Sequence, residues 1–444
     1  MLNRLFKLDQ HGTTVVRELQ AGATTFAAMA YILAVNPAIL ANTGMDRGAL
    51  VTVTALTAAL ATLLMAWLTN YPIAMAPGMG INAFFTFTIC GVHGVPWQEA
   101  LGMVFINGVI FLLLSVTGVR EKIIEAIPPN LKIAITCGMG VFIAFIGLQT
   151  SGVIVAHPET LVTAGDFTSG PVWLCLSGIG LTALLIARRI PGAIVIGMIA
   201  VTVAGLFVRA GGRTVTTLPD HFFALPASPA PVMFKLSFQF LTTSNASFMA
   251  LPLILTLLLV DLFDNIGTLI GVTKRAGFLR DDGTLPKAGR ALVADSLATI
   301  LSALGGTSTV VSYIESASGV EAGGRTGLTT VTTALLLLGA LFLTPLILIV
   351  PPAATGPALV LVGVFMMQSV GEIDLREFKI ALPAILTLIA IPLMFSIAEG
   401  IGLGLMATAV MAYGLGEKKS VTSMGYFLAA FFFLQFFKIW PFSR

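Results

Sequence analysis

The sequence predicts an all-α polytopic membrane protein that crosses the bilayer about fourteen times, in two inverted repeats of seven segments. Three observations support this prediction: the composition, the lengths of the apolar segments and weak internal repeats. Of the 444 residues, 57% are hydrophobic and only 10% are charged, and the mean hydropathy is +0.97. An ordinary soluble domain carries about 25% charged residues, so the composition excludes that class. The net charge of +3 comes from scattered Lys and Arg and indicates no nucleic-acid partner.

Apolar segments of about 20 residues can each cross a bilayer as one helix. Segments of this kind lie near 22–42, 48–68, 98–117, 131–150, 171–187, 191–208, 247–270, 290–304, 327–347, 355–370, 380–395 and 399–414. Two further crossings, near 71–90 and 307–322, are interrupted by Gly, Pro and polar residues. A last apolar run, 424–440, is either a membrane-surface helix, which we favour, or an extra span.

The basic residues predict the orientation of the chain in the membrane. Lys and Arg precede the first span, as at Arg4, and follow the even-numbered spans, as at Arg188 and Lys418. Because basic loops stay in the cytoplasm, both termini are expected there, in a protein of the plasma membrane.

Two weak repeats relate the halves of the chain. A Pro-Pro pair followed by Gly-Val-Phe occurs from Pro128 and again from Pro351, and a seven-residue apolar segment recurs at Leu60 and Leu297. Apolar words recur by chance, but both repeats join a span to the seventh span after it. Since seven is odd, the second half should be inverted. The expected organisation is a first repeat over 1–209, a connecting extracytoplasmic loop over 210–245, a second repeat over 246–416 and an amphipathic or surface segment over 417–444.

The two interrupted segments occupy corresponding positions, spans three and ten. Span three contains Pro72 and Pro77 and should resume its helix near Ile81; span ten breaks at 305–306, with Ser312 as the expected N-cap. Paired interrupted spans in inverted halves indicate a transporter's midplane site, where half-helix N-termini face the substrate. The alternative is a re-entrant loop with a purely structural role.

Acidic residues inside the spans are the candidate functional groups. Asp261, Asp264 and Thr268 have the spacing of one helix face in span eight, while Asp295 lies in span nine and Glu315 in span ten. All four histidines fall in loops. A proton carried through the membrane would therefore move on carboxylates, although each of these residues could instead have a capping or packing role.

Four words of the sequence resemble one family of transporters. They are DLFDNIGT from Asp261, SYIESASGVEAGGRTGL from Ser312, PGMGINAFF from Pro77 and VNPAIL from Val35. They are similar to the adenine/guanine/hypoxanthine permeases, the AzgA-like branch of the xanthine/uracil permease superfamily. The resemblance implies a uracil-transporter-type fold in which a core domain of spans 1–4 and 8–11 moves past a gate domain of spans 5–7 and 12–14. It also implies a possible homodimer through the gate domains.

The same resemblance implies a set of residues that bind the substrate. The family's carboxylates fall on Asp264 and Glu315, with Tyr313 and Ser316 on either side of the glutamate, and the polar residue of span three falls on Asn82. Thr268 joins this set through its helix face. Asn265 stands where Thr is common in this branch, which leaves the preferred purine unspecified.

The function expected from the sequence is import of purine nucleobases by H⁺ symport, with Na⁺ as the other possible coupling ion, and with no cofactor or metal. Glu315 is expected to accept hydrogen bonds from the base. Asp264 is expected to load the proton, with Asp261 and Asp295 next in line. Phe84 and Phe263 could cover the ring faces, although each could equally be packing.

Two other readings remain at this stage. An anion transporter or channel of the same fold is disfavoured by the negative charge of Glu315. A membrane-embedded aspartyl protease is disfavoured because the G-x-G-D word of such enzymes is absent.

Overall fold

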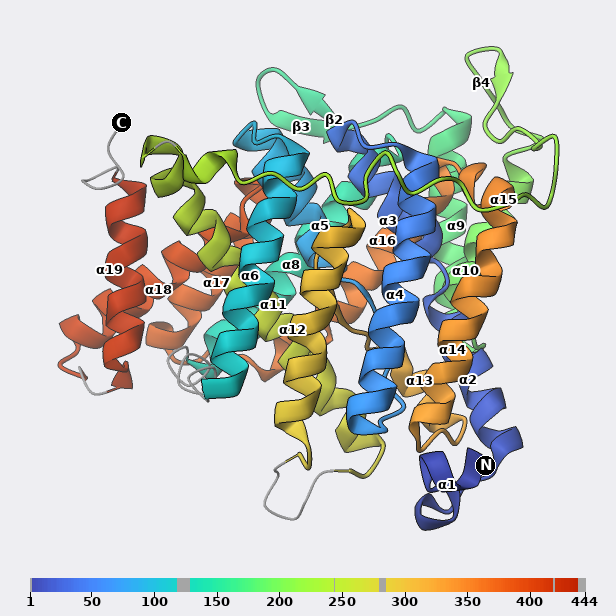
Figure 1. Cartoon of the computed structure of the whole chain (residues 1–444). Coiled ribbons are helices and arrows are strands. Elements are labelled where there is room, and N and C mark those ends of the chain that lie inside the picture. The colour runs from blue at the N-terminus through green and yellow to red at the C-terminus, as the bar shows by residue number, and fades with distance from the viewer. Residues whose placement is uncertain (1, 118–127, 243, 279–284, 418–419, 438–444) are drawn as a thin grey trace.

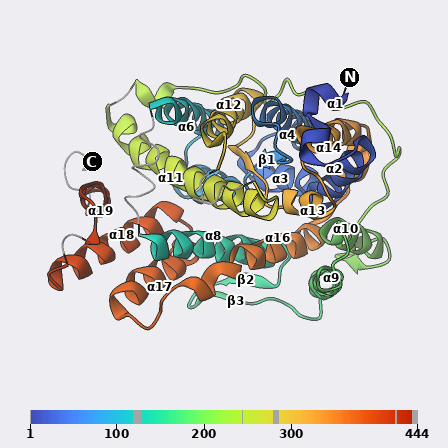
Figure 2. The ribbon, with the colours of Figure 1, turned by 90° about the horizontal axis from the view of Figure 1, so that it is seen from below.

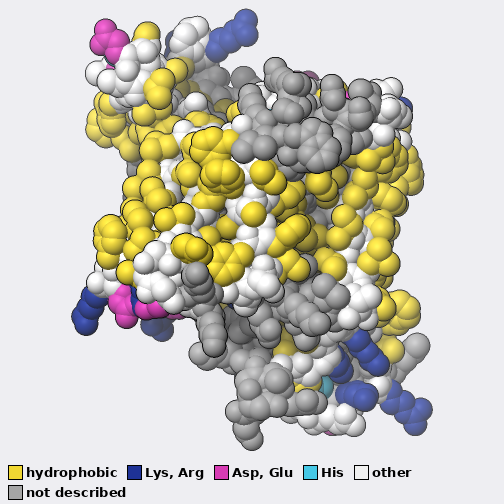
Figure 3. Space-filling model, turned by 90° about the vertical axis from the view of Figure 1, so that its left-hand side faces the viewer, with side chains coloured by type: hydrophobic (Ala, Val, Ile, Leu, Met, Phe, Trp, Pro, Cys, Tyr) yellow, Lys and Arg dark blue, Asp and Glu magenta, His cyan; other side chains and the backbone are white. Residues whose placement is uncertain are grey.

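A bundle of helices running in roughly the same direction forms the body of the molecule (Figure 1). The computed structural model describes residues 2–117, 128–242, 244–278, 285–417 and 420–437. Hydrophobic side chains cover the middle of the surface, and Lys and Arg side chains gather at its two ends (Figure 3). An apolar belt between charged ends is the surface of a protein that spans a bilayer.

The first half of the chain supplies the elements of spans one to seven. They are α1 (Leu2–Phe6), α2 (Val15–Met29), α3 (Ile32–Leu40), α4 (Arg47–Thr69), β1 (Met75–Pro77), α5 (Met79–Ala83), the π-helix η3 (Phe84–Val92), α6 (Trp97–Thr117), α8 (Pro129–Thr150), the hairpin β2 (Ile154–His157) and β3 (Leu161–Ala164), α9 (Gly170–Ala187) and α10 (Ala193–Ala204). The second half, after the short strands β4 (Arg209–Ala210) and β5 (Arg213–Thr214), supplies α11 (Ser244–Arg275), α12 (Ala288–Gly305), β6 (Val310–Ser312), α13 (Ser316–Glu321), α14 (Gly327–Gly339), the 3₁₀ turn η5 (Ala340–Leu343), α15 (Thr344–Leu348), α16 (Pro352–Met366), α17 (Phe378–Leu393), α18 (Ile397–Gly414) and α19 (Ser423–Phe436).

The predicted order of spans is confirmed. Within the described residues, nine helices are long and apolar enough to cross a membrane, and shorter apolar helices occupy the other continuous spans. Spans three and ten are interrupted as expected. Each consists of a short strand followed by a short helix, β1 then α5 and β6 then α13.

The inverted symmetry of the two halves is visible where repeat counterparts meet. The shift that takes Leu60 to Leu297 also takes Met75 to Ser312, and these two residues pair directly in the antiparallel β1–β6 ladder. The same shift takes Met79, the first residue of α5, to Ser316, the first residue of α13. A residue that touches its own counterpart must lie close to the two-fold axis relating the halves, so this axis passes through the β1–β6 pair.

A second crossing of the same kind lies between α8 and α16. The shift that takes Pro128 to Pro351 takes Gly140 to Gly363. A side chain on Gly140 would collide with the Gly363 carbonyl oxygen, and one on Gly363 would collide with the Gly140 carbonyl oxygen. Glycine at both positions therefore allows the two backbones to approach closely, as small residues do in membrane helix pairs.

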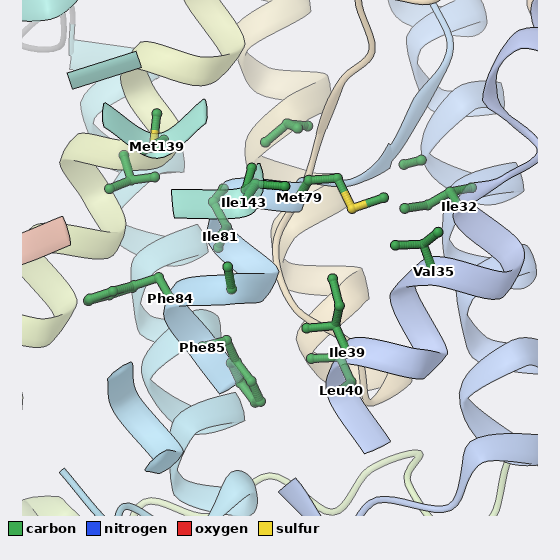
Figure 4. Close-up of a cluster of buried hydrophobic side chains, with 14 of the residues drawn as sticks. Ile32, Val35, Ile39, Leu40, Met79, Ile81, Phe84, Phe85, Met139 and Ile143 are labelled. Atoms are coloured by element: carbon green, nitrogen blue, oxygen red, sulfur yellow. The ribbon is translucent and has the colours of Figure 1, made fainter. Parts of the chain in front are cut away.

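Seen along the bundle, the helices form two groups that lie side by side (Figure 2). The first group contains α2, α3, α4, α6, α11, α12, α13 and α14, and the second contains α8, α9, α10, α16, α17 and α18. A cluster of buried apolar side chains joins them. It brings Ile81 of α5 and Phe84 of η3, which pack with the first group, close to Met139 and Ile143 of α8 (Figure 4).

The polar Gly-Gly-Arg-Thr-Gly-Leu segment after span ten links helices within the first group. Glu18 of α2 is completely buried and its carboxylate accepts five hydrogen bonds from this segment and from the first turn of α14. The donors are the Arg325 N–H and the N–H and hydroxyl groups of Thr326 and Thr329. A negative charge at a helix N-terminus satisfies the unpaired N–H groups there. Glu18 therefore fixes α2, the segment between α13 and α14, and the start of α14 to one another.

The last helix, α19, differs from the surface orientation expected for the C-terminal segment. It packs against α18 and runs along the neighbouring spans, so that its C-terminal end lies at the side of the molecule opposite to α1 (Figure 1). Its inner face carries Leu428 and Phe432, and its outer face exposes Phe427 and Phe433. A helix that is apolar on both faces has no polar side to present to water, unlike an amphipathic surface helix.

Candidate functional site

The two interrupted spans meet at the centre of the first group. Their strands β1 and β6 pair through Met75–Ser312, Ala76–Val311 and Pro77–Val310. The Gly78 N–H donates to the Thr309 carbonyl at 3.0 Å, and the Tyr313 N–H donates to the Ala74 carbonyl at 2.9 Å. Non-helical backbone survives inside a membrane protein only when its polar groups are satisfied. The strand pair meets this condition and aims the two half-helices at a common region.

The half-helix α5 begins immediately after Gly78, two residues earlier than the expected start at Ile81. Its first N–H groups have no carbonyl partner within the helix. A side-chain carbon placed on Gly78 would lie 3.3 Å from Asp264 Oδ2. The Asp264 carboxyl group therefore sits beside the positive end of this half-helix, in space that glycine leaves open.

The half-helix α13 begins at Ser316, and Glu315 occupies its N-cap position. The expectation that Ser312 is the N-cap is wrong, because Ser312 belongs to β6 and its N–H donates to Asn265 Oδ1 at 3.3 Å. Pairing with β1 keeps the chain extended for longer than the local sequence indicates. Glu315 is consequently placed just before the helix rather than within its first turn.

Two tyrosines hold the Glu315 region. The Tyr31 hydroxyl donates to Glu315 Oε1 at 2.5 Å, and the Tyr313 hydroxyl donates to the Pro77 carbonyl at 2.7 Å. Tyr31 lies between α2 and α3, where the first span is itself interrupted. Sequence reasoning missed Tyr31; the signal available was a lone phenol inside an apolar span, which must find a hydrogen-bond partner when buried.

A small cavity of about 60 Å³ lies between these groups. It is lined by the predicted residues Asp264, Thr268, Tyr313 and Glu315, and by Tyr31, Gly78 and Gly80. Val362 and Met366 of α16, from the second helix group, close its other side. A polar cavity of this size admits water. A larger ligand needs α16 to move away from the first group.

A larger cavity of about 280 Å³ lies elsewhere, between the ends of α8, α17 and α18, and is lined by Leu131, Lys379 and Met411 among others. It contains neither Asp264 nor Glu315. We assign the candidate site by the buried carboxylates and the half-helix ends rather than by cavity size.

Several residues expected at the site do not line the cavity. Asn82 is completely buried and its Oδ1 accepts from the Ser308 hydroxyl. The Ser316 hydroxyl accepts from the Ala74 N–H at 3.0 Å. Both side chains therefore hold a half-helix to a neighbouring extended segment and do not face the cavity. Phe84 is packed in the apolar cluster, and the side chain of Phe263 lies outside the described part of the chain.

The other two acidic candidates are also separate from the cavity. Asp261 and Asp295 are completely buried, and Asp261 faces α6, where Asn107 Nδ2 donates to its Oδ2 at 3.1 Å. Asp261 and Asp264 are three residues apart, so their side chains leave α11 in directions about 60° apart around the helix axis. This angle is enough to direct the two side chains to different neighbours.

Comparison with known families agrees with this architecture. A model described as the Permease family matches residues 17–403. The chain belongs to this family. The guanine/hypoxanthine permease PbuG of Bacillus subtilis is 42% identical over 444 residues, covering 98% of this chain and 99% of the relative. The adenine permease AdeP of Escherichia coli is 40% identical over 435 residues, covering 98% and 96%. These relatives of this permease are transporters, which removes the membrane-enzyme alternative.

Solved structures show the same fold for the permease. The transmembrane domain of the cyanobacterial bicarbonate transporter BicA superposes with a TM-score of 0.65 at 16% identity, covering 86% of this chain and 97% of that one. SLC26A9 superposes with a TM-score of 0.63 at 11% identity, covering 93% and 68%. At such low identity these similarities concern the fold alone, and they confirm the predicted inverted-repeat transporter architecture.

Proposed function

We propose that this permease imports purine nucleobases by H⁺ symport, with adenine, guanine and hypoxanthine as the candidate substrates. The observation that supports it most is the pair of carboxyl groups, Asp264 and Glu315, that face one cavity at the starts of two half-helices. The relatives named for guanine, hypoxanthine and adenine supply the substrate class.

The chemistry of a purine base fits these groups. The base is flat and uncharged, and its edges carry N–H donors and ring-nitrogen acceptors. The Glu315 carboxylate can accept from N–H groups of the base, and the free N–H groups at the start of α5 can donate to a ring nitrogen or carbonyl. Val362 and Met366 lie where they would cover one face of the ring, and the flexible methionine can adapt its shape to the base.

The charge at the site also argues against the anion alternative. BicA transports bicarbonate, according to its name, and it shares only the fold with this chain. Here two acidic side chains line the cavity, and none of the described residues that line it is Lys or Arg. An anion bound between them would be repelled by any ionised carboxylate in a low-dielectric environment.

We further propose that the first helix group acts as a core that slides past the second, which acts as a gate. The cavity lies between the groups, with Val362 and Met366 as its gate wall. The connecting segment after β5 is tied to the first group: the Thr52 hydroxyl donates to the Ala227 carbonyl, the Phe234 N–H to the Leu304 carbonyl, and the Ser237 N–H to the Gln98 carbonyl. These ties would make the segment move with the core.

In the membrane, we propose that the N-terminus is cytoplasmic, as the basic residues around Arg4 and Lys7 indicate. The direction of α19 favours the opposite side for its own C-terminal end, against the expectation from the sequence. We propose that the gate group provides the contact if the protein forms a homodimer.

Uptake competition tests the proposed function. Cells or liposomes carrying the protein take up labelled adenine in the presence of unlabelled guanine, hypoxanthine, xanthine or uracil, with and without an uncoupler. We expect competition by purines of the adenine, guanine and hypoxanthine group, and loss of accumulation when the proton gradient collapses. Competition by none of these bases would overturn the substrate class. Accumulation that survives the uncoupler and needs a sodium gradient would assign Na⁺ as the coupling ion instead.

A further inference from the structure

Asp261 and Asn107 form a buried pair outside the substrate cavity. Asn107 lies in the middle of α6 and donates from Nδ2 to Asp261 Oδ2 of α11 at 3.1 Å, and both side chains are completely buried. Next to Asn107, Gly108 lets α6 pack directly on α12, since a side chain there would collide with Ile300. This close packing fixes the helix from which Asn107 reaches α11.

One atom of the pair shows what the pair binds. Asn107 Oδ1 is a buried acceptor that receives no hydrogen bond. Buried polar atoms in native proteins almost always have a partner, so one that has none points to a missing proton, water or ion. Oδ1 belongs to the same amide as Nδ2, which contacts the Asp261 carboxyl group. A carboxylate has no hydrogen to donate to it, whereas a protonated carboxyl group has one.

A proton on Asp261 supplies the missing donor. The protonated Asp261 would donate from Oδ1 to Asn107 Oδ1 while Oδ2 continues to accept from Asn107 Nδ2. The two bonds close a ring between the acid and the amide. Both oxygens of the acid, and the oxygen and the nitrogen of the amide, then each have a hydrogen-bond partner. The neutral acid is also the form that burial favours, because an isolated charge is far more costly to bury.

We propose that the Asp261–Asn107 pair is the proton-binding site of the transporter, distinct from the carboxyl groups that contact the substrate. The inference rests on the proposed symport function. It assigns the transported proton to Asp261, one helical turn before Asp264, the residue that the sequence analysis favoured for this role. The step is a proton transfer alone. The proton adds to Asp261 Oδ1 from water on one side of the membrane and returns to water on the other, and no bond between heavy atoms changes.

The neighbouring ionisable groups explain how proton and substrate can be coupled. On α11 and on the helices around it they are Asp264, Glu99 of α6, Lys132 of α8, Arg290 and Asp295 of α12, Glu315 and Glu321 at the two ends of α13, and Glu399 of α18. The basic residues at the end of α11 are more than three helical turns away. Asp264 is one turn from Asp261, and two ionised carboxylates at this spacing repel each other. An ionised Asp264 that holds a base therefore favours the protonated form of Asp261.

Substitution of Asp261 by Asn tests the proposal, because the amide has the shape of the protonated acid and can still pair with Asn107. In purified protein reconstituted into liposomes, we expect Asp261→Asn to bind purine within about twofold of wild type. It should exchange labelled for unlabelled base across the membrane but should not concentrate base in response to a pH gradient. Asp295→Asn is the comparison variant, because Asp295 is the other completely buried acid outside the cavity; Glu159→Gln in the exposed hairpin loop is the control and should still concentrate base. Wild-type accumulation by Asp261→Asn, or loss of accumulation in Asp295→Asn alone, would overturn the assignment.

An infrared measurement separates this proposal from the proposed function. The wild-type protein should show the carbonyl band of a buried protonated carboxyl group, shifted in D₂O, and Asp261→Asn should lose that band. If Asp261→Asn does not fold, Asp261→Glu should move the band instead of removing it. A band that is unchanged in the variant would refute the protonated pair. This result would stand even if the protein transported no purine, in which case the proposed function would fail separately.

Discussion

Replacing Glu315 by Gln tests the substrate site most directly. Tyr31 donates to Glu315 Oε1 at 2.5 Å, and the carbonyl oxygen of a glutamine can accept the same bond. The substitution should therefore preserve the local fold around α13. It removes the negative charge and turns the second acceptor oxygen into an NH₂ group, which cannot accept a hydrogen bond from the base.

The size of the effect follows from this exchange. A hydrogen bond to a charged group contributes about 1.5–3 kcal/mol, which corresponds to roughly a ten- to hundredfold change in Kd. Since Glu315 is one of two carboxyl groups at the cavity, we expect purine binding to weaken by about this factor rather than to vanish.

Titration calorimetry on the purified variant with adenine, guanine and hypoxanthine measures this change. Glu321→Gln provides the matched control, because Glu321 is an exposed residue at the far end of the same half-helix and should bind purine like the wild type. Wild-type affinity in Glu315→Gln would show that the cavity between the half-helices is not the substrate site.

Three further predictions follow from the structure. Asp264→Asn should weaken purine binding, because the Asp264 carboxyl group lines the cavity beside α5. Unchanged affinity together with lost accumulation would show that Asp264, not Asp261, binds the transported proton. Glu18→Ala should lower the melting temperature of the solubilised protein, since each buried donor it leaves unpaired costs about 1–3 kcal/mol, whereas Glu159→Ala in the exposed hairpin loop should not; equal melting of the two variants would contradict the role of Glu18. A topology reporter fused after Gly416 should be active on the cytoplasmic side and one fused after Phe437 on the other side; cytoplasmic activity of both fusions would show that α19 does not cross.

The order of spans and the inverted halves could be predicted because they depend on properties the chain carries locally. The length of an apolar run sets whether it can cross a bilayer. Paired breaks by Pro and Gly in spans three and ten mark half-helices, and the recurrence of words such as those at Leu60 and Leu297 reveals the repeat. None of this requires knowledge of which residues touch.

The partners of the site residues could not be predicted, because they come from segments far apart in the sequence. The pairing of β1 with β6 decided that Glu315, not Ser312, stands at the N-cap of α13. The contact with Glu315 likewise identified Tyr31 as a site residue. The direction of α19 was also a tertiary matter, since an apolar run of its length is compatible with either a surface or a transmembrane position.

The sequence by itself determined that this chain is a multispanning permease with two interrupted spans and with acidic residues inside the spans of its second half. Hydrophobic length, helix-breaking residues and intramembrane charge have costs that do not depend on the fold. Only the tertiary structure decided which groups surround each of those carboxyl groups. It placed Asp264 and Glu315 at the cavity, directed Asp261 to Asn107 instead, and gave Glu18 a purely internal set of donors. The role of a buried carboxyl group depends on the donors within about 3 Å of it, and those donors come from other helices.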